Sequence, residues 1–197
     1  MAFIETIPEE EATGPVAEAY ADDRAGWGFL PNFSKVFALR PEVYAAWSQL
    51  NGSVRKVMDR RRYELATVAA AHQLRSSYCT MAHSRVLRDR FYDAQTVREI
   101  VVDRRAAGLD EVDVAVMDFA EQVAADATAI TADDVDKLRR LGLSDVEVLD
   151  IALAVGVRSF FAKVLDAVGA LPDAQFREIL EPELQEALTI GRPIAET

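Results

Sequence analysis

The sequence predicts an all-α protein. Hydrophobic residues recur at helical spacing within segments of roughly 10 to 25 residues, and the 9 glycines and 7 prolines fall mainly between those segments. Half of the 197 residues are hydrophobic and 28% are charged, which is typical of a chain that folds around a core. A chain of this length needs only one core, so we expect a single domain.

The first 50 residues are predicted to form a helical arm in front of the core. Thr13 is a candidate N-cap for a helix from residue 15 to about residue 23, which the Gly26-Trp27-Gly28 segment then interrupts. A short helix over 31–39 and a longer one over 41–58 follow, each with a proline near its start. The longer helix carries an apolar stripe that needs a partner, formed by Val43, Trp47, Leu50 and Val54.

Residues 51–170 are predicted to form the core. Asp59 can cap a helix over 60–74, whose interior LATVAAAHQL is rich in alanine and nearly free of charge, so this helix should be buried at the centre. After a bend at residues 75–77, another helix is expected over 78–91. Four more follow, over 94–107 (capped by Asp93), 110–127, 132–141 (capped by Thr131) and 145–168 (capped by Ser144).

The last of these helices carries apolar stripes that we expect to join the core or to pack against another subunit; they comprise Val148, Ile151, Ala152, Val155 and residues 160–164. The C-terminal tail, 171–197, is amphipathic and acidic over 174–188, where we expect added helical structure. The final segment IGRPIAET is predicted to be a flexible end.

Charge and hydropathy exclude several classes of partner. The formal net charge of -11 argues against binding to nucleic acid or to anionic membranes, because both require clustered lysine and arginine. No run of about 18 apolar residues occurs, and the N-terminal segment is acidic where a signal peptide would be basic and then apolar. The single cysteine cannot form an internal disulfide. We therefore expect a soluble cytoplasmic protein.

Cys79 and His83 form the first candidate catalytic pair. They lie four residues apart at the beginning of a predicted helix, so their side chains share one helix face. The positive end of the helix dipole favours a thiolate at that position, and a neighbouring imidazole can accept the thiol proton. A lone cysteine is more often a buried structural residue, and that interpretation stays open on the pattern alone.

Glu64 is the third candidate catalytic residue. An isolated carboxylate in an alanine-rich helix is costly to bury, so Glu64 should either face Cys79 and His83 as a proton relay or pair with an arginine in 60–62. His72 is a supporting candidate that could also point into the pocket, although a histidine in such a helix is more often a satisfied core group. No spacing typical of a zinc site occurs, so we expect neither a metal nor a cofactor.

The segment around these residues has a positive local charge. Residues 51–92 hold nine Lys or Arg against three Asp or Glu, although the chain as a whole is acidic. Such a surround favours a thiolate and attracts anionic substrates, but it is more often a solvated face paired with acidic neighbours.

The stretch from Glu64 to His83 resembles the alkylhydroperoxidase D and carboxymuconolactone decarboxylase superfamily. Peroxidase members carry a glutamate, eleven intervening residues, a Cys-x-x-Cys pair, three more residues and a histidine. Glu64, Cys79 and His83 occupy the matching positions, whereas Ser76 replaces the first cysteine and Tyr78 precedes the second. The segments PEEEATGPVAEAY, GFLPNF and SDVEVLDIALAVGVRSFFAKVLDAVG also resemble the peroxidase-related subgroup.

The resemblance implies an orthogonal helical bundle, with helices added at both ends, that assembles into dimers, trimers or hexamers. It also implies a thiol-dependent peroxidase in which the second cysteine reacts, the histidine and glutamate move its proton, and the first cysteine completes a disulfide. Because Ser76 removes that last step, an external thiol must regenerate Cys79, and Ser76 could instead hydrogen-bond the thiolate or the substrate oxygen.

Two alternatives remain open. The decarboxylase branch converts a small carboxylated lactone with acid and base groups and without a redox cysteine pair, so the loss of one cysteine keeps that activity in view. A noncatalytic helical oligomer that only binds a ligand is the other alternative. The preferred prediction is a hydroperoxide-reducing enzyme with Cys79, His83 and Glu64 as its catalytic residues.

Overall fold

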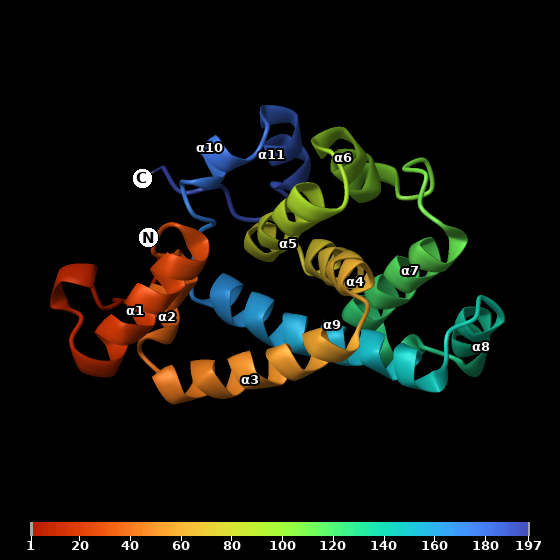
Figure 1. Ribbon diagram of the computed structural model, residues 1–197, viewed down its shortest axis with the longest axis horizontal. Helices are drawn as coiled ribbons and strands as arrows, with labels where there is room; N and C mark the ends of the chain where they lie inside the picture. Colours follow the sequence, from red (N-terminus) through yellow and green to blue (C-terminus); the bar gives the residue numbers. More distant parts are fainter. Residues whose placement is uncertain (1, 197) are drawn as a thin grey trace.

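The computed structural model describes residues 2–196, which form eleven α-helices, two short 3-10 helices and no strand, confirming the all-α prediction (Figure 1). The α-helices are α1 (Gly14–Trp27), α2 (Asn32–Phe37), α3 (Pro41–Val57), α4 (Arg60–Gln73), α5 (Ser77–Arg90), α6 (Ala94–Asp103), α7 (Glu111–Asp126), α8 (Ala132–Arg140), α9 (Asp145–Ala167), α10 (Phe176–Ile179) and α11 (Pro182–Leu188). The 3-10 helices span Glu9–Glu11 and Ala127–Ala129.

Helix α4 lies at the centre of the bundle, as its alanine-rich sequence predicts. Every residue from Tyr63 to Ala71 is buried, and α5, α7 and α9 pack around the helix (Figure 1). Small alanine side chains let these neighbours approach closely, because little side-chain volume separates the helix axes. Asp59 caps α4 by accepting a hydrogen bond from the Arg62 backbone N–H at 2.9 Å.

The N-terminal arm packs on the long helix α9. In Figure 1 α3 runs beside α9, and the Trp47 indole N–H donates to the Val157 carbonyl oxygen at 3.1 Å. The predicted stripe on α3 is only half correct, because Trp47 and Val54 face the bundle while Val43 and Leu50 remain 44% and 51% exposed. Positions seven apart share a helix face, so Val43 and Leu50 lie together, and they line an exposed groove with Val157 and Phe160 of α9.

Helix α1 is longer than predicted. The Gly26-Trp27-Gly28 segment does not interrupt it at residue 23; the helix continues to Trp27 and ends where Gly28 adopts a left-handed φ of 85°. Gly26 keeps helical geometry, so only the second glycine terminates the helix.

The C-terminal tail is helical in part, and its end differs from the prediction. Pro182 separates α10 from α11, because proline starts a helix readily but cannot continue one. The end of the chain is not free up to residue 196: Ile194 and Ala195 are buried, and the Ala195 N–H donates to the Pro172 carbonyl at 2.9 Å. Thr197, also in the predicted flexible end, lies outside the described residues.

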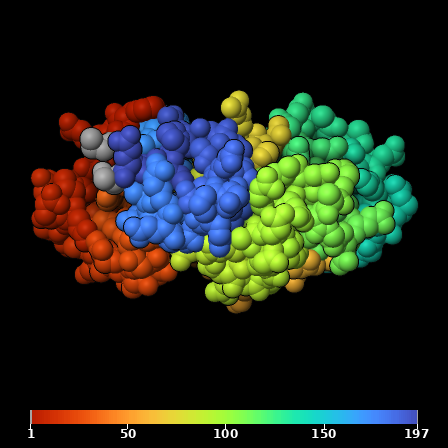
Figure 2. Space-filling model, turned by 90° about the horizontal axis from the view of Figure 1, so that it is seen from above, coloured from red at the N-terminus to blue at the C-terminus, as the bar shows by residue number. Residues whose placement is uncertain are grey.

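The C-terminal helices cover α5 and α6, and Figure 2 shows the blue C-terminal residues against the yellow-green residues of these helices. Leu184 and Leu188 are buried in the main core cluster, so the tail is part of the bundle. Across residues 2–196, none of the helices combines the length and the apolar character needed to cross a bilayer.

Candidate active site

A left-handed bend between α4 and α5 positions the predicted cysteine. Arg75 adopts a φ of 57°, and the Ser76 N–H reaches back to the Ala71 carbonyl at 3.0 Å, which closes the end of α4. Helix α5 then begins at Ser77, so Cys79 lies in its first turn, near the positive end of the helix dipole.

The C-terminal segment holds this bend in place. The Gly191 N–H donates to the Ser77 hydroxyl at 2.8 Å. A Cβ atom at Gly191 would lie 2.0 Å from the Arg75 carbonyl oxygen, so no side chain fits there without a backbone shift. The geometry at Cys79 therefore depends on residues more than a hundred positions later in the chain.

Glu64 and His83 meet across the two helices. Glu64 Oε2 lies 2.5 Å from His83 Nδ1, and Glu64 Oε1 lies 2.7 Å from Arg60 Nη2 in an ion pair that lacks hydrogen-bond alignment. The Glu64 side chain is almost completely buried, whereas 15% of the His83 side chain is exposed. Glu64 thus contacts the histidine with one oxygen and an arginine with the other, and its role as a proton relay stays a prediction.

Burial and the neighbouring arginines set the protonation states of Glu64 and His83. Burial raises the pKa of Glu64, but the adjacent His83, Arg60 and Arg158 outweigh burial and hold that pKa below its ordinary value. Burial and the nearby Arg158 lower the pKa of His83, although Glu64 opposes them. Near neutral pH, Glu64 is therefore a carboxylate and His83 is neutral, with Nδ1–H donating to Glu64 and Nε2 free to accept a proton.

Cys79 contacts a buried cation. Its sulfur lies 3.5 Å from Nη1 of Arg158, which extends from α9, and the two residues are only 1% and 4% exposed. Burial lowers the pKa of Arg158, but Cys79 and Tyr63 raise it to a net value above the ordinary one, so Arg158 stays charged. Within residues 2–196 no carboxylate forms an ion pair with this guanidinium, and a buried cation without an anion is costly.

These residues line one pocket of about 300 Å³, named here the Cys79 pocket. One part of its wall is polar, with Glu64, Cys79, His83 and Arg158. The remainder is largely aromatic, and we call Phe33, Tyr44, Trp47 and Phe161 the aromatic wall. Trp47 and Phe161 stack with centroids 4.2 Å apart, and Arg158 lies 5.9 and 5.6 Å from those two ring centroids.

The structure brings the three predicted catalytic residues to the same pocket without joining all of them. Glu64 bonds His83, but the Cys79 sulfur has Arg158 as its hydrogen-bonding neighbour rather than His83. Tyr78 lines the pocket with its ring, while its hydroxyl donates to Asp173 and accepts from the Phe33 N–H at 3.3 Å. Tyr78 therefore anchors the N-terminal arm.

Ser76 and His72 lie outside the Cys79 pocket. The buried Ser76 hydroxyl lies beside Asp166 on α9 and makes no hydrogen bond to the Cys79 sulfur. His72 follows Glu64 by eight residues, which rotates it by about 80° around α4. It consequently faces Glu121 and Arg104, and burial lowers its pKa.

Sequence reasoning missed Arg158 and the aromatic wall. A signal for Arg158 was present, because this arginine interrupts the apolar run ALAVGVRSFFAKV, where a charge requires a partner. The aromatic wall joins α2 and α3 to the distant helix α9, so no local pattern reveals it.

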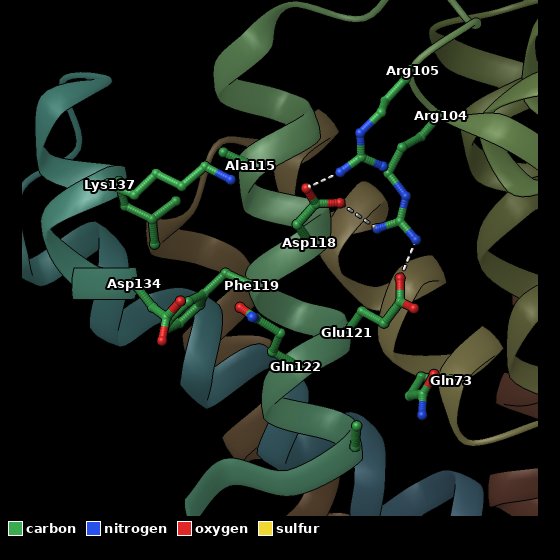
Figure 3. A pocket seen from close by; sticks show the side chains of 12 residues that line it. Gln73, Arg104, Arg105, Ala115, Asp118, Phe119, Glu121, Gln122, Asp134 and Lys137 are labelled. Atoms are coloured by element: carbon green, nitrogen blue, oxygen red, sulfur yellow. Dashed lines mark hydrogen bonds and ion pairs between the residues drawn. The ribbon is translucent and has the colours of Figure 1, made fainter. Parts of the chain in front are cut away.

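A second and larger pocket, of about 520 Å³, lies between α7, α8 and the end of α6. Figure 3 shows Arg104 and Arg105 converging on Asp118, with Arg104 also reaching Glu121. We call this pocket the Arg104 groove. Within residues 2–196, neither pocket nor any other region gathers three His, Cys, Asp or Glu side chains in an arrangement that could hold a metal ion.

The all-α bundle that holds a cysteine, a glutamate–histidine pair and an arginine in one pocket matches alkylhydroperoxidase D-like folds. Residues 41–122 match the model of the carboxymuconolactone decarboxylase family. The match begins with α3 and contains α4 and α5, the helices that supply Glu64, Cys79 and His83.

Solved structures show the same fold. An uncharacterized peroxidase-related protein from Ralstonia eutropha, described as an alkylhydroperoxidase AhpD core, is 20% identical, with a TM-score of 0.80 over 89% of this chain and 94% of that one. A peroxidase-related protein from Silicibacter is 22% identical, with a TM-score of 0.75 over 88% and 90%. The debrominase Bmp8 is 14% identical, with a TM-score of 0.72 over 93% and 94%. No curated protein matches the chain.

Proposed function

We propose that this protein is a thiol-dependent oxidoreductase that reduces hydroperoxides through Cys79. The observation that carries the proposal is the contact between the Cys79 sulfur and the buried guanidinium of Arg158 in the pocket that also holds the Glu64–His83 pair. A cation 3.5 Å from the sulfur favours negative charge there, and the thiolate is the nucleophilic form of cysteine.

The proposed reaction gives Cys79, His83 and Glu64 one role each: nucleophile, proton carrier and stabiliser of the imidazolium. His83 Nε2 accepts the thiol proton, and Glu64 stabilises the resulting imidazolium through Nδ1–H. The thiolate attacks the terminal peroxide oxygen, so an S–O bond forms while the O–O bond breaks, and the departing alkoxide takes the proton back from His83. The products are a sulfenic acid at Cys79 and an alcohol.

An external thiol completes the cycle. The chain has no second cysteine, and Ser76 occupies the position of the resolving cysteine in the motif. A first external thiol condenses with the sulfenic acid to give a mixed disulfide and water, and a second releases the Cys79 thiol and a disulfide product.

The direct test is treatment of the reduced protein with one equivalent of cumene hydroperoxide in the presence of dimedone, followed by mass spectrometry. We expect dimedone-trapped sulfenic acid at Cys79 and consumption of the peroxide. The Cys79→Ser variant should consume none. A thiol that remains unmodified in the wild-type protein, with no other activity, would instead favour the noncatalytic alternative.

Cofactor-free lyase chemistry is the second candidate function. It is favoured by the match to the carboxymuconolactone decarboxylase family and by three arginines beside a neutral histidine base in one pocket. In this case, turnover of a carboxylated lactone should survive Cys79→Ser and disappear in Glu64→Gln. The reverse result, loss with Cys79→Ser, supports the thiol reaction. Because a variant of Bmp8 was solved with 2,3,4-tribromopyrrole, that compound belongs in the same substrate panel.

We also propose that the protein assembles with copies of itself through an apolar stripe along α3 and α9. The stripe consists of Val43, Leu50 and Val57 on α3 with Val146, Leu149, Leu153 and Phe160 on α9, each between 40% and 67% exposed. Val43, Leu50 and Phe160 line one groove between the two helices. Exposed apolar surface of this kind marks interaction sites, and a second copy fits the oligomers that the family resemblance implies. In sedimentation measurements, Leu50→Glu should yield monomers. The control Val102→Glu, on exposed α6 surface outside the stripe, should leave the oligomer intact. A monomeric wild-type protein would contradict the proposed assembly.

A further inference from the structure

We infer that the Cys79 pocket binds a small aromatic carboxylate. The inference names the chemical features of a ligand that the pocket recognises, and it rests on the proposed function only in taking this pocket as the substrate site. Its evidence is the combination of an aromatic wall with more arginine charge than Glu64 balances; the proposed thiol chemistry uses Arg158 but neither Arg55 nor the aromatic wall.

The aromatic wall offers ring faces to a flat ligand. Tyr44, Trp47 and Phe161 form a continuous stack, with centroid distances of 6.1 Å and 4.2 Å between neighbours. All three rings line the pocket, so a planar molecule can extend the stack with its own ring. A saturated ring of the same size lacks the flat π face and would lose that part of the interaction.

The charges that line the pocket do not balance. Arg55, Arg60 and Arg158 face a single carboxylate, Glu64, which already contacts Arg60 and His83. Neither Arg55 nor Arg158 forms an ion pair with another side chain of residues 2–196. The pocket is therefore positive although the whole chain has a formal charge of -11.

The negative charge of a carboxylate ligand would balance the excess positive charge of the pocket. Guanidinium groups bind carboxylates through paired, charge-assisted hydrogen bonds, and the interaction is stronger in a largely desolvated pocket than in water. A cationic ligand is disfavoured by the same three arginines. The volume of about 300 Å³ lies at the lower end of the range for ligand pockets, which limits the ligand to one or two rings.

The two tryptophans make binding measurable without any turnover. Trp27 and Trp47 are the only tryptophans in the chain, and both line this pocket, so intrinsic fluorescence reports on its occupancy. The titration uses Cys79→Ser, which cannot perform the thiol reaction, with benzoate, benzamide and cyclohexanecarboxylate as probes. Binding is thus tested separately from peroxide reduction, whose outcome is read from sulfenic acid in the wild-type protein.

We expect benzoate to change the emission saturably and to bind at least tenfold more tightly than either benzamide or cyclohexanecarboxylate. Arg158→Gln and Arg55→Gln, each introduced into Cys79→Ser, should weaken benzoate binding at least threefold without weakening benzamide binding. Arg105→Gln, in the Arg104 groove, is the matched control and should leave the affinity unchanged. Because Arg55 is exposed, its variant tests the charge requirement even if Arg158→Gln fails to fold.

Three results would overturn the inference. Equal affinity for benzoate and benzamide would remove the requirement for an anion, and equal affinity for benzoate and cyclohexanecarboxylate would remove the requirement for an aromatic ring. Unchanged benzoate binding in Arg55→Gln and in folded Arg158→Gln would show that these arginines do not hold the carboxylate.

Discussion

The Cys79 pocket and the Arg104 groove both contain arginines and carboxylates, but they differ in how the charges are compensated. In the larger Arg104 groove, Asp118 and Glu121 face Arg104 and Arg105, so both arginines have an acidic partner (Figure 3). In the smaller Cys79 pocket, the buried Arg158 faces a thiol instead. The comparison teaches that a charge left without its usual partner is a better indication of chemistry than the size of a cavity.

Replacing one histidine in each region should give the largest difference. His83→Ala removes the proposed base, so the rate of peroxide reduction should fall about a hundredfold, the usual contribution of general base catalysis. His72→Ala, on the side of α4 that faces the Arg104 groove, should retain the wild-type rate. Stopped-flow measurement of peroxide consumption compares the two, and equal losses would remove the distinction between the regions.

An arginine from each region provides the next comparison. Arg158→Gln leaves the thiolate and the transition state without their cation, and we expect a rate reduction of at least tenfold. Arg105→Gln breaks only an exposed ion pair with Asp118 and should change the rate less than twofold. The same stopped-flow assay serves, with circular dichroism as the control for folding. A wild-type rate in Arg158→Gln would refute a chemical role for this arginine.

The pH dependence sharpens the assignment of the base. Because the pKa of His83 is lowered, its neutral form persists below the ordinary histidine value of about 6.5. The rate should therefore stay near its maximum as the pH falls to about 6.5 and decline only below it, as His83 becomes protonated. A rate profile for the wild-type protein from pH 5 to pH 8 tests this, and a midpoint above 6.5 would contradict it.

The bend that positions Cys79 should be sensitive to a single methyl group. Gly191→Ala places Cβ against the Arg75 carbonyl, and we expect a loss of about 1–3 kcal/mol in the free energy of unfolding, as for other overpacked sites. Gly26→Ala meets open space within α1 and should instead stabilise the protein by about 0.5–1 kcal/mol. Urea denaturation measures both. Equal stabilities would show that the bend adapts freely.

Much of the fold follows from local sequence. The boundaries of α3, α4 and α9 fall within about two residues of the expected positions, because proline, Asp59 and Ser144 provide strong starting signals. The tail was harder to predict, since its burial depends on α5 and α6 rather than on its own pattern. The same limit explains why Leu50 was expected to be covered: amphipathicity predicts an apolar face but not which neighbour covers it.

The residues of the candidate site likewise include some that the sequence predicts and others that only the tertiary structure reveals. Spacing along α5 and the family resemblance identified Cys79, His83 and Glu64 as candidates, and the structure brings them to one pocket. The Arg158 contact requires α9 to cross near the start of α5, a tertiary relationship that no spacing encodes. Their roles in catalysis stay predictions, and Ser76 shows why: a residue in register with the motif can still point away from the pocket.

Alkylation of the protein with iodoacetamide at pH 7 tests the central claim most directly, because Cys79 is the only thiol in the chain. If Arg158 holds a nucleophilic sulfur in an accessible pocket, Cys79 reacts at least as fast as free cysteine, and Arg158→Gln slows the reaction. A wild-type thiol that reacts far more slowly than free cysteine, with no change in Arg158→Gln, would identify Cys79 as a buried structural residue and contradict the account.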